Sequence, residues 1–214
     1  MIKLNNISFK YENENKLVFN NFNLEINDNE CLIIKGDNGT GKTTLFKIIN
    51  GLVYPSGDYY FNDTKIDKNY LNNNINQKKF HKEIGYLFQN VDVMLFNNSV
   101  YDEIAFGPRQ MNLTEEEIDN RVNDLLKLFK IEDLKDKAPY HLSGGQKKKV
   151  ALASLLSLNP SVLVLDEPMA TLDNKSKLDL ENLLIELKKS GKTLIIATHD
   201  DSFANKIGDR IINL

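Results

Sequence analysis

The residues of this chain best suited to do chemistry form a glycine-rich stretch, GDNGTGKT, at Gly36–Thr43. The stretch fits the pattern G-x-x-x-x-G-K-[ST] in full. Its glycines allow backbone angles that a side chain would forbid, so several N–H groups can point at one anion. The Lys42 ammonium adds a mobile charge for the β- and γ-phosphates of a nucleotide, and the Thr43 hydroxyl can ligate Mg²⁺.

The position of this stretch separates a phosphate-binding loop from a chance match. An apolar run precedes it and a predicted helix follows it, and the positive N-terminal end of that helix would face the phosphates. We therefore predict a nucleotide site that uses a continuous set of residues: Gly36, Asp37, Asn38, Gly39, Thr40, Gly41, Lys42, Thr43 and Thr44.

A second candidate is the acidic end of another apolar run, VLVLDEP, at Val162–Pro168. Asp166 can reach Mg²⁺ beside the phosphate loop, usually through water. Glu167 is placed to orient or deprotonate the water that attacks the γ-phosphate. Acidic residues also commonly start loops, so this motif gains its meaning from the phosphate loop upstream.

A third candidate, LSGGQ at Leu142–Gln146, precedes a predicted helix. Ser143 can cap that helix, and Gly144 and Gly145 expose backbone N–H groups, which makes a second anion site. A Ser-Gly-Gly turn is also an ordinary way to start a helix. Because one nucleotide needs only one cradle, we expect the segment from Ser143 to Gln146 to serve a nucleotide held by another subunit.

The elements that must position these motifs follow from the hydrophobic pattern. Alternation of apolar and polar residues predicts antiparallel strands near Ile2–Tyr11 and Phe19–Ile26. Continuous apolar runs predict buried strands at Cys31–Lys35, Ile84–Phe88 and Val162–Asp166. Further strands are predicted over 57–66, with a turn at Asn62–Asp63, and in the segments TLIIAT and RIINL. The Asn- and Lys-rich segment from 68 to 79 has no period, so a surface loop or a frayed helix is expected there.

The middle of the chain has helical spacing instead. Thr114 with Glu117 forms a capping box ahead of a helix that runs to Phe129, and another helix follows Ser143. Residues from about 90 to 160 are predicted to form a mainly helical subdomain inserted in an α/β frame. Strand–helix alternation on both sides of it favours a mostly parallel, doubly wound sheet, within one domain that spans 1–214.

The composition sets outer limits on function. Of the 214 residues 41% are hydrophobic and 27% are charged, which excludes a largely disordered chain. The net charge of −3 gives no bulk electrostatic reason to expect nucleic acid as the main partner. The single cysteine, Cys31, lies in an apolar run and is expected to be a buried, reduced thiol. No apolar run approaches the roughly 18 residues of a membrane span, and the first residues lack a signal-peptide pattern, so a soluble intracellular chain is expected.

Taken together, GDNGTGKTT, Gln89, LSGGQ, VLVLDEP, Asp173 and His199 resemble the ATP-binding cassette (ABC) ATPases, in the order and spacing of that family. The resemblance covers essentially the whole chain. It implies a P-loop NTPase fold of the ABC type, with a mostly parallel core sheet, an antiparallel β subdomain and an inserted helical subdomain. It also implies ATP and Mg²⁺ as cofactors.

Further residue roles come from the resemblance alone. It implies that Tyr11 stacks on adenine, that Gln89 senses Mg²⁺ and a membrane partner, that Asp173 communicates across a dimer and that His199 contacts the γ-phosphate. The catalytic set implied is Glu167, His199 and Gln89, and the metal ligands implied are Thr43, Gln89 and Asp166. Tyr11 is alternatively a strand-end aromatic, and Gln89 and His199 are alternatively polar caps of strands. His81 and His141 have no motif role and are expected at the surface or in loops.

The segment that follows Gln89 also resembles a narrower group, the ATPases of cobalt, nickel and energy-coupling-factor (ECF) vitamin transporters. The similar pieces are Phe96, the stretch from Val100 to Glu103, and AFGP at 105–108. Five apolar residues here are expected to line a groove for a helix of a membrane subunit, with packing inside the helical subdomain as the alternative: Val91, Val93, Met94, Leu95 and Phe96. The chain differs from the group at Met169 and Ala170, and members commonly continue well past the switch histidine, whereas this sequence ends fifteen residues after His199.

The function implied is the ATP-hydrolysing subunit of a membrane transporter at the cytoplasmic face of the membrane, most similar to ECF or cobalt/nickel importers. Two copies, or this chain and a related one, would hold two ATP molecules, each between Gly36–Thr44 of one subunit and Ser143–Gln146 of the other. The other partner implied is a membrane-embedded subunit, and no nucleic acid is expected. The alternatives are another class of ABC transporter, an ABC ATPase that acts on DNA or ribosomes, and a nucleotide-binding scaffold without turnover.

Overall fold

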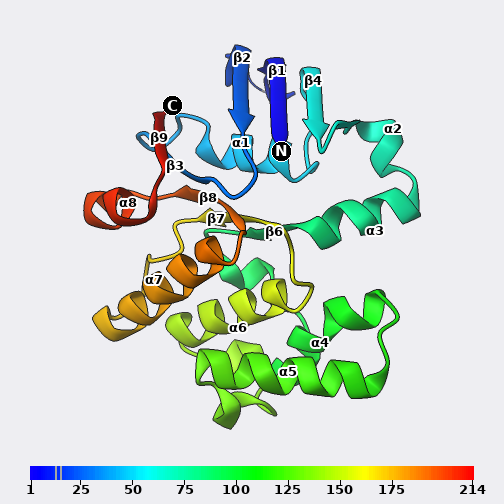
Figure 1. Cartoon of the computed structure of the whole chain (residues 1–214), viewed down its shortest axis with the longest axis vertical. Coiled ribbons are helices and arrows are strands. Elements are labelled where there is room, and N and C mark those ends of the chain that lie inside the picture. The colour runs from blue at the N-terminus through cyan, green and yellow to red at the C-terminus, as the bar shows by residue number, and fades with distance from the viewer. Residues whose placement is uncertain (13, 15) are drawn as a thin grey trace.

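Two sheets and a group of helices make up the structure, a computed structural model that describes residues 1–12, 14 and 16–214. Figure 1 shows the antiparallel strands at the top, the parallel strands across the middle, and a group of helices at the bottom. These helices are α4 (Val100–Gln110), α5 (Glu115–Phe129) and α6 (Gly144–Leu156). The layers confirm the α/β fold with an inserted helical segment.

The antiparallel sheet has the strand order β2-β1-β4-β5. Its strands are β1 (Ile2–Phe9), β2 (Phe19–Ile26), β4 (Ser56–Phe61) and β5 (Thr64–Lys65). Leu4 pairs with Leu24 across the ladder and both side chains are buried, so the alternation in the sequence is the alternation between core and solvent. The first strand ends at Phe9, two residues before the predicted end. Asn62 and Asp63 both have positive φ, which confirms the predicted turn.

The parallel sheet has the strand order β6-β7-β8-β3-β9. Its strands are β3 (Cys31–Lys35), β6 (Ile84–Leu87), β7 (Val162–Asp166), β8 (Thr193–Ala197) and β9 (Arg210–Asn213). Each neighbouring pair is parallel, so the carboxyl ends of the strands meet at one edge of the sheet. The phosphate loop, Gln89 and His199 each follow one of these strands and Asp166 ends another, so all four are brought to that edge.

Alternate residues of the parallel strands pack into two different cores. Ile33, Leu163 and Ile196 belong to the core shared with α4, α5 and α6. Leu32 and Val164 belong to the core shared with the antiparallel sheet and with α1 (Lys42–Ile49). Both faces of the sheet are therefore covered, which explains why these strands read as continuous apolar runs.

Two helices replace the loop expected after residue 67: α2 (Lys68–Leu71) and α3 (Asn74–Glu83). Asp67 accepts a hydrogen bond from Tyr70 N–H at 2.8 Å, and the Asn73 side chain accepts from the first turn of α3. Such caps stabilise a helix start by about 1 kcal/mol. Leu71 and Phe80 are the buried anchors. Of the two expectations for 68–79, the helix therefore holds and the surface loop is wrong; too few apolar residues mark a period to separate the two from the sequence.

The histidines without a motif role lie as follows. His81 is half-buried in α3, where burial lowers its pKa, and is not in a loop as one expectation had it. His141 is exposed in the short 3-10 helix η3 (Pro139–His141).

The remaining helices connect the last parallel strands along the chain. The helix α7 (Asn174–Lys189) follows β7 and precedes β8 in the sequence, and α8 (Asp201–Ile207) follows β8 and precedes β9. Two further 3-10 helices, η1 (Val91–Val93) and η2 (Glu132–Leu134), belong to the inserted segment. The predicted capping box of Thr114 and Glu117 is present, and Ser143, predicted to cap its helix, forms a second capping box with Gln146; the Thr114 and Ser143 hydroxyls accept from the N–H groups of Glu117 and Gln146. The mainly helical character predicted for residues from about 90 to 160 is confirmed.

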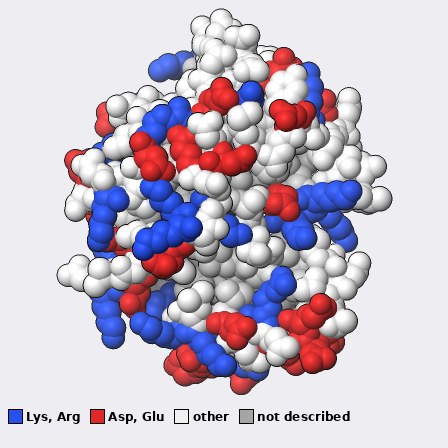
Figure 2. Space-filling model, in the orientation of Figure 1, with Lys and Arg blue, Asp and Glu red and all other residues white. Residues whose placement is uncertain are grey.

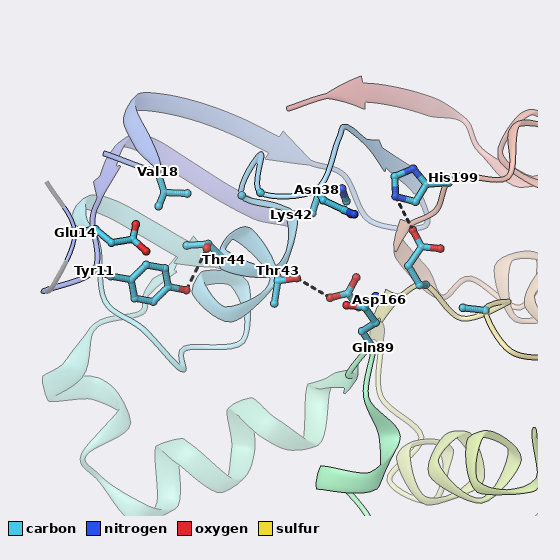
Figure 3. A pocket seen from close by; sticks show the side chains of 14 residues that line it. Tyr11, Glu14, Val18, Asn38, Lys42, Thr43, Thr44, Gln89, Asp166 and His199 are labelled. Carbon is cyan, nitrogen blue, oxygen red and sulfur yellow. Dashed lines mark hydrogen bonds and ion pairs between the residues drawn. The ribbon is translucent and has the colours of Figure 1, made fainter. Parts of the chain in front are cut away.

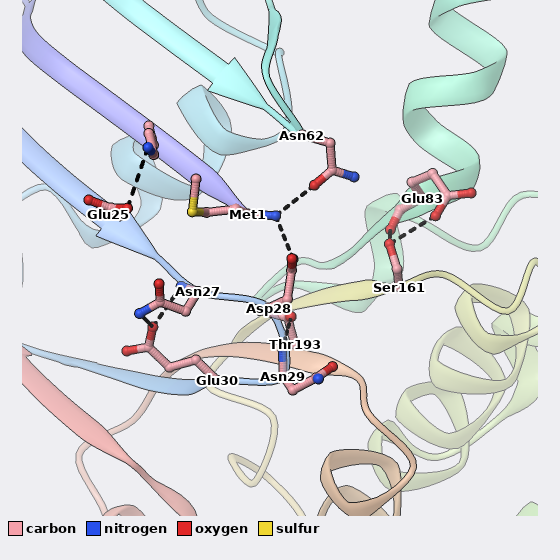
Figure 4. A network of polar contacts seen from close by, with 11 residues as sticks. Met1, Glu25, Asn27, Asp28, Asn29, Glu30, Asn62, Glu83, Ser161 and Thr193 are labelled. Carbon is pink, nitrogen blue, oxygen red and sulfur yellow. Dashed lines mark hydrogen bonds and ion pairs between the residues drawn. The ribbon is translucent and has the colours of Figure 1, made fainter.

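A polar network joins the antiparallel sheet to the parallel sheet (Figure 4). The amino group of Met1 lies 2.5 Å from Asp28 and 2.6 Å from Asn62, which belong to two different turns. Asn29, next to Asp28, donates its N–H to the Thr193 hydroxyl at the start of β8, at 2.9 Å. The start of β1 is thereby tied to the turn that leads into β3 and the phosphate loop.

Two features bear on the expectations from composition: the distribution of surface charge and the burial of Cys31. On the face drawn in Figure 2, Lys and Arg side chains are interspersed with Asp and Glu side chains. Cys31 is a buried free thiol, and burial raises its pKa to about 12. Among the described residues, no helix is both long enough and apolar enough to cross a membrane.

Candidate functional site

A cleft of about 750 Å³ opens at the carboxyl edge of the parallel sheet (Figure 3). It gathers residues from five separate places in the sequence. Its lining consists of Tyr11, Glu14, Val18, Asn38, Gly39, Gly41, Lys42, Thr43, Thr44, Gln89, Asp166, Glu167, Ala170 and His199. Eleven of the predicted site residues therefore share one cavity, and Gly36, Asp37 and Thr40 form the base of the phosphate loop outside its lining.

Steric limits explain the glycines at the two ends of the phosphate loop. Gly36 has a φ of 148°, and a Cβ there would lie 2.6 Å from the Thr40 hydroxyl oxygen. Gly41 has a φ of 107°, and a Cβ there would lie 2.8 Å from a methyl of Val18. Gly41 is also the N-cap of α1 and has no side chain to cap it, so the first N–H groups of α1 stay available to an anion.

The Lys42 ammonium lies against the loop itself. Nζ donates hydrogen bonds to the carbonyl oxygens of Gly36, at 2.6 Å, and Asp37, at 2.8 Å. These bonds hold the loop closed around the position where the phosphates would bind. A phosphate oxygen arriving beside Nζ would add a charge-assisted hydrogen bond.

Two side chains whose oxygen atoms could ligate a metal ion meet where α1 starts and β7 ends. The Thr43 hydroxyl donates to Asp166 Oδ2 at 3.0 Å. Burial raises the pKa of Asp166, and the hydrogen bond from Thr43 and the positive charge of Lys42 oppose that rise. A hydroxyl and a carboxylate, with the Gln89 amide in the same cleft, are hard oxygen ligands of the kind that Mg²⁺ prefers. Mg²⁺ commonly takes one or two protein carboxylates plus phosphate and water, and Asp166 is the carboxylate next to Thr43.

Glu167 and His199 face each other across the cleft. Glu167 Oε1 lies 3.4 Å from His199 Nε2. That oxygen is buried and accepts no hydrogen bond from the residues that the structure describes. Burial raises the pKa of Glu167, and the neighbouring His199 lowers it. A buried acceptor without a donor, at the end of a strand and beside a phosphate loop, is suited to hold a water molecule and take its proton.

The buried lysine Lys148, in α6, belongs to this site although the sequence did not indicate it. Its Nζ donates to the carbonyl oxygens of Glu167, at 3.0 Å, and Ala170, at 2.7 Å. Burial lowers the pKa of Lys148, and the charges of Glu167 and Asp166 oppose that shift. The available signal was its helical spacing to Ala151 and Leu152, which places it on the buried face of α6.

Tyr11 lies where the resemblance implies, at the wall of the cleft. Its hydroxyl is 3.1 Å from the Thr44 hydroxyl, and Lys47 Nζ lies 5.9 Å from the centre of its ring. Val18 lines the same wall, and Glu14 lies there too. These two were not predicted, because neither belongs to a motif.

Asp173 caps α7 within its own chain. It accepts hydrogen bonds at 2.9 Å from the Ser176 N–H and hydroxyl, and these bonds lower its pKa. Asp173 does not line the cleft. A capping role is therefore present in one chain, and communication across a dimer stays a prediction.

The segment from Ser143 to Gln146 starts α6 and does not line the cleft. Ser143 N–H donates to Gln146 Oε1 at 3.0 Å, which completes the capping box. A Cβ added to Gly144 would meet no atom within 4 Å, so the fold of this chain leaves open space there. Within one chain the second predicted anion site is thus separate from the first.

The apolar residues after Gln89 divide into two groups. Val91 is buried and Met94 and Leu95 pack against the helical core, so the alternative of internal packing holds for these three. Val93 is 67% exposed and Phe96 is 65% exposed, and the Phe96 ring packs edge-on against the Phe106 ring. Only the second group is free to meet another protein.

Comparison with known proteins agrees with the site. The family model for the ABC transporter matches residues 19–170. A putative ABC transporter ATP-binding protein of Clostridium acetobutylicum is 50% identical, over 99% of this chain and 88% of that one. A nickel import ATP-binding protein of Lactiplantibacillus plantarum is 43% identical over 99% and 88%, and an energy-coupling factor transporter ATP-binding protein of Clostridium acetobutylicum is 39% identical over 98% and 74%.

Solved structures give the same result. An ATP-binding cassette in a dimeric post-hydrolysis state, bound to ADP and Pi, superposes with a TM-score of 0.90 at 31% identity, over 100% of this chain and 94% of that one. The cbiO1 protein of Clostridium perfringens, part of the ABC transporter complex cbiONQ, superposes with a TM-score of 0.84 at 39% identity, over 99% and 83%.

The fold and the cleft define a P-loop nucleotide-binding protein. The chain belongs to the ABC transporter family. It is an ATP-binding subunit that hydrolyses ATP, which confirms the family, the fold and the enzymatic activity predicted from the sequence.

Proposed function

We propose that this chain, over residues 1–214, is one ABC ATP-binding domain that powers a membrane importer of the ECF or cobalt/nickel type. The observation that carries the proposal is the single cleft that joins the phosphate loop to Asp166, Glu167 and His199. The narrower class is supported by the relatives whose names refer to nickel import and to energy-coupling factor transport, and by the similarity to cbiO1.

In this proposal the phosphate loop holds ATP and the acidic edge hydrolyses it. Backbone N–H groups from Gly36 to Thr44 and the Lys42 ammonium bind the β- and γ-phosphates, and Tyr11 stacks on adenine. Mg²⁺, held by Thr43, Gln89 and Asp166 with the nucleotide, would neutralise charge on the phosphates.

The water-activating step belongs to the chain's own residues at the other end of the cleft. Glu167 Oε1 accepts the proton of the attacking water, because it is a buried acceptor to which none of the described residues donates a hydrogen bond. His199, beside it, contacts the γ-phosphate and keeps the carboxylate oriented.

Each ATP would be shared with a second ABC subunit, either a copy of this chain or a related one. Ser143, Gly144, Gly145 and Gln146 would close over the nucleotide bound by that partner. Two features support this arrangement: the four residues lie outside the cleft of their own chain, and space is open around Gly144. The cassette that superposes with this chain was solved as a dimer.

A groove of about 320 Å³ beside the helical segment is the proposed seat of the membrane subunit. Its walls come from the segment after α1, from α3, α4 and α6 and from the end of β6, and include Leu52, Phe88, Phe106 and Leu158. None of the five apolar residues predicted to line a groove is part of this lining. Leu52 is 47% exposed and Phe106 is 40% exposed, so apolar side chains are open to a docking helix. Gln89 follows Phe88 directly, so a helix seated here would reach the Mg²⁺ end of the cleft, and the chain would sit at the cytoplasmic face of the membrane.

The test is hydrolysis and transport by the chain assembled with membrane proteins encoded next to its gene. We expect ATP-dependent uptake of nickel, cobalt or a vitamin into proteoliposomes, and no uptake with the Glu167→Gln variant. Hydrolysis at the parental rate by Glu167→Gln would exclude the proposed role of Glu167. Uptake of none of these solutes by an assembled, hydrolysing complex would exclude the proposed transporter class.

A further inference from the structure

The turn that carries Glu167 is held in an unusual conformation by one buried side chain. Glu167 has a φ of 50° and Thr171 a φ of 67°, so two residues other than glycine lie in the left-handed region within five positions. The Ala170 N–H donates to the Glu167 carbonyl oxygen at 3.2 Å, which closes the turn. Left-handed backbone is unfavourable for residues that carry a side chain, so the turn needs support from its surroundings.

Lys148 provides that support from a different element. Its ammonium donates hydrogen bonds to the Glu167 carbonyl oxygen at 3.0 Å and to the Ala170 carbonyl oxygen at 2.7 Å, and thus binds both ends of the turn. The side chain is only 2% exposed. Burying an ammonium is unfavourable unless its hydrogen bonds are satisfied, and here the acceptors that satisfy them are backbone carbonyls. The contact therefore restrains the main chain of Glu167 and leaves its carboxylate free.

The restraint also connects two parts of the proposed site. Lys148 lies in the second turn of α6, the helix that Ser143 caps. Glu167 N–H donates to the Ala197 carbonyl at 3.1 Å, so the residue is fixed between β8 on one side and α6 on the other. A small rotation of the Glu167 backbone would move Oε1 away from His199, and misplacement of a reacting group by about 1 Å can lower a rate by roughly 100-fold.

We propose that Lys148 is a positioning residue for ATP hydrolysis: it clamps the Glu167–Ala170 turn to α6 and thereby aims the Glu167 carboxylate at the attacking water. The inference rests on the proposed role of Glu167. It assigns to Lys148 no contact with nucleotide, so its effect belongs to turnover and not to ATP binding.

Three variants test the clamp. Lys148→Met keeps the length of the side chain and removes its donors, Lys148→Arg keeps donors, and Lys149→Met is the matched control on the next residue of α6. Lys148→Met is expected to lower kcat by about 10- to 100-fold, with KM and the Kd for ATP within about twofold of the parent. Lys148→Arg should recover at least part of kcat, and Lys149→Met should behave as the parent.

A purely structural role for Lys148 would give a different pattern. Loss of the fold around α6 would also prevent ATP-driven dimerisation, whereas the clamp predicts that Lys148→Met combined with Glu167→Gln still forms an ATP-bound dimer on size-exclusion chromatography. If Lys148→Met does not fold, Lys148→Gln, which keeps a neutral donor, is measured for the same split between kcat and KM.

Two failures can be told apart. If Glu167→Gln hydrolyses ATP at the parental rate, the proposed function of Glu167 is wrong and the clamp has no target. If Glu167→Gln is inactive but Lys148→Met, or in its place Lys148→Gln, keeps the parental kcat, only the clamp is wrong. A loss of ATP affinity equal to the loss of kcat/KM would also overturn it.

Discussion

At the scale of single residues, the chemistry proposed for the cleft depends on one oxygen atom, Glu167 Oε1. This atom is buried, lies beside His199 and accepts no hydrogen bond from the described residues. A buried acceptor left without a donor destabilises a fold by about 1–3 kcal/mol. In the proposed function this is the position where hydrolysis needs an open acceptor for water, so the loss of stability would be balanced by activity.

Replacement of Glu167 by Gln is expected to stop hydrolysis and to stabilise the nucleotide-free chain. Burial raises the pKa of Glu167, so its ionised form is less favourable in the folded chain than in the unfolded chain. The resulting loss of stability is absent below the unfolded pKa and complete above the folded pKa. At neutral pH, removal of the Glu167 charge should raise Tm by about 2–4 °C, which is the shift that roughly 1 kcal/mol produces in a chain of this size.

The pH dependence of this difference is the measurement. Calorimetric Tm values of Glu167→Gln and of the parent should converge as the pH falls toward the pKa of Glu167, because the parent then becomes neutral as well. Equal Tm values at neutral pH, or a difference that grows on acidification, would contradict the assignment of a buried, destabilising carboxylate.

Lys42 gives a second residue-scale prediction. Lys42→Ala removes the phosphate charge together with the two bonds to Gly36 and Asp37 that keep the loop closed. We expect ATP binding at least about 100-fold weaker, since hydrogen bonds to charged groups contribute roughly 1.5–3 kcal/mol each. Titration calorimetry measures it, with Lys65→Ala on β5 as a control of unchanged affinity. A Kd within a few-fold of the parent would refute the phosphate-loop assignment.

At the scale of elements, the start of α6 separates what the fold needs from what a partner needs. The capping box satisfies the N–H groups of Ser143 and Gln146, but the fold gives no steric reason for glycine at position 144. A partner's nucleotide that approaches the backbone closely would give that reason.

Gly144→Ala should therefore fold normally and work poorly. Its Tm is expected to be equal to that of the parent or slightly higher, because alanine is favoured over glycine in a helix by up to about 1 kcal/mol. Binding of ATP to the monomer should be unchanged, while ATP-driven dimerisation and hydrolysis fall by about tenfold or more. Parental turnover by a well-folded Gly144→Ala chain would show that nothing approaches this position.

Elements with strong local signals could be predicted from the sequence. The buried strands β3, β7 and β8 follow from continuous apolar runs, and α5 follows from its capping box and apolar period. The helices after residue 67 could not be predicted in this way, because caps at Asp67 and Asn73 and a few buried anchors replace a regular pattern.

The site was predictable where chemistry repeats in a motif and unpredictable where it depends on packing. The phosphate loop, Asp166 and Glu167 are marked by residue type and spacing. Lys148 is the middle of three consecutive lysines, which reads as a solvated face, and only the rotation of α6 against the turn after β7 buries it. The hydrophobic period of the sequence does not define the rotation of a helix accurately enough to predict a single hydrogen bond.

At the scale of the whole molecule, the proposed function has one chain contribute complementary halves to two different sites. The phosphate loop, Asp166 and Glu167 line its own cleft, whereas Ser143–Gln146 does not line it. If this chain pairs with itself, a damaged half in one copy can be complemented by an intact half in another.

Mixing Ser143→Arg chains with Lys42→Ala chains tests this complementation. Each alone should be inactive, but every mixed dimer holds one intact site and one doubly damaged site. Random pairing makes about half of the dimers mixed, so hydrolysis should return to at most about a quarter of the parental rate if one site can turn over alone. The isolated Ser143→Arg chain should still bind ATP, and loss of that binding would place Ser143 in its own chain's site.

The two cores that share the parallel sheet also set how the sequence can drift over evolutionary time. Along β3, Ile33 packs in the helical core, whereas its neighbours Leu32 and Ile34 pack in the core shared with the antiparallel sheet and α1. Adjacent residues of this strand therefore pack against different side chains. Substitutions in adjacent positions of one strand should therefore be nearly independent, while a substitution at Ile33 should be compensated from α4, α5 or α6. Repacking of the helical core can then proceed without disturbing the core that supports α1 and the phosphate loop.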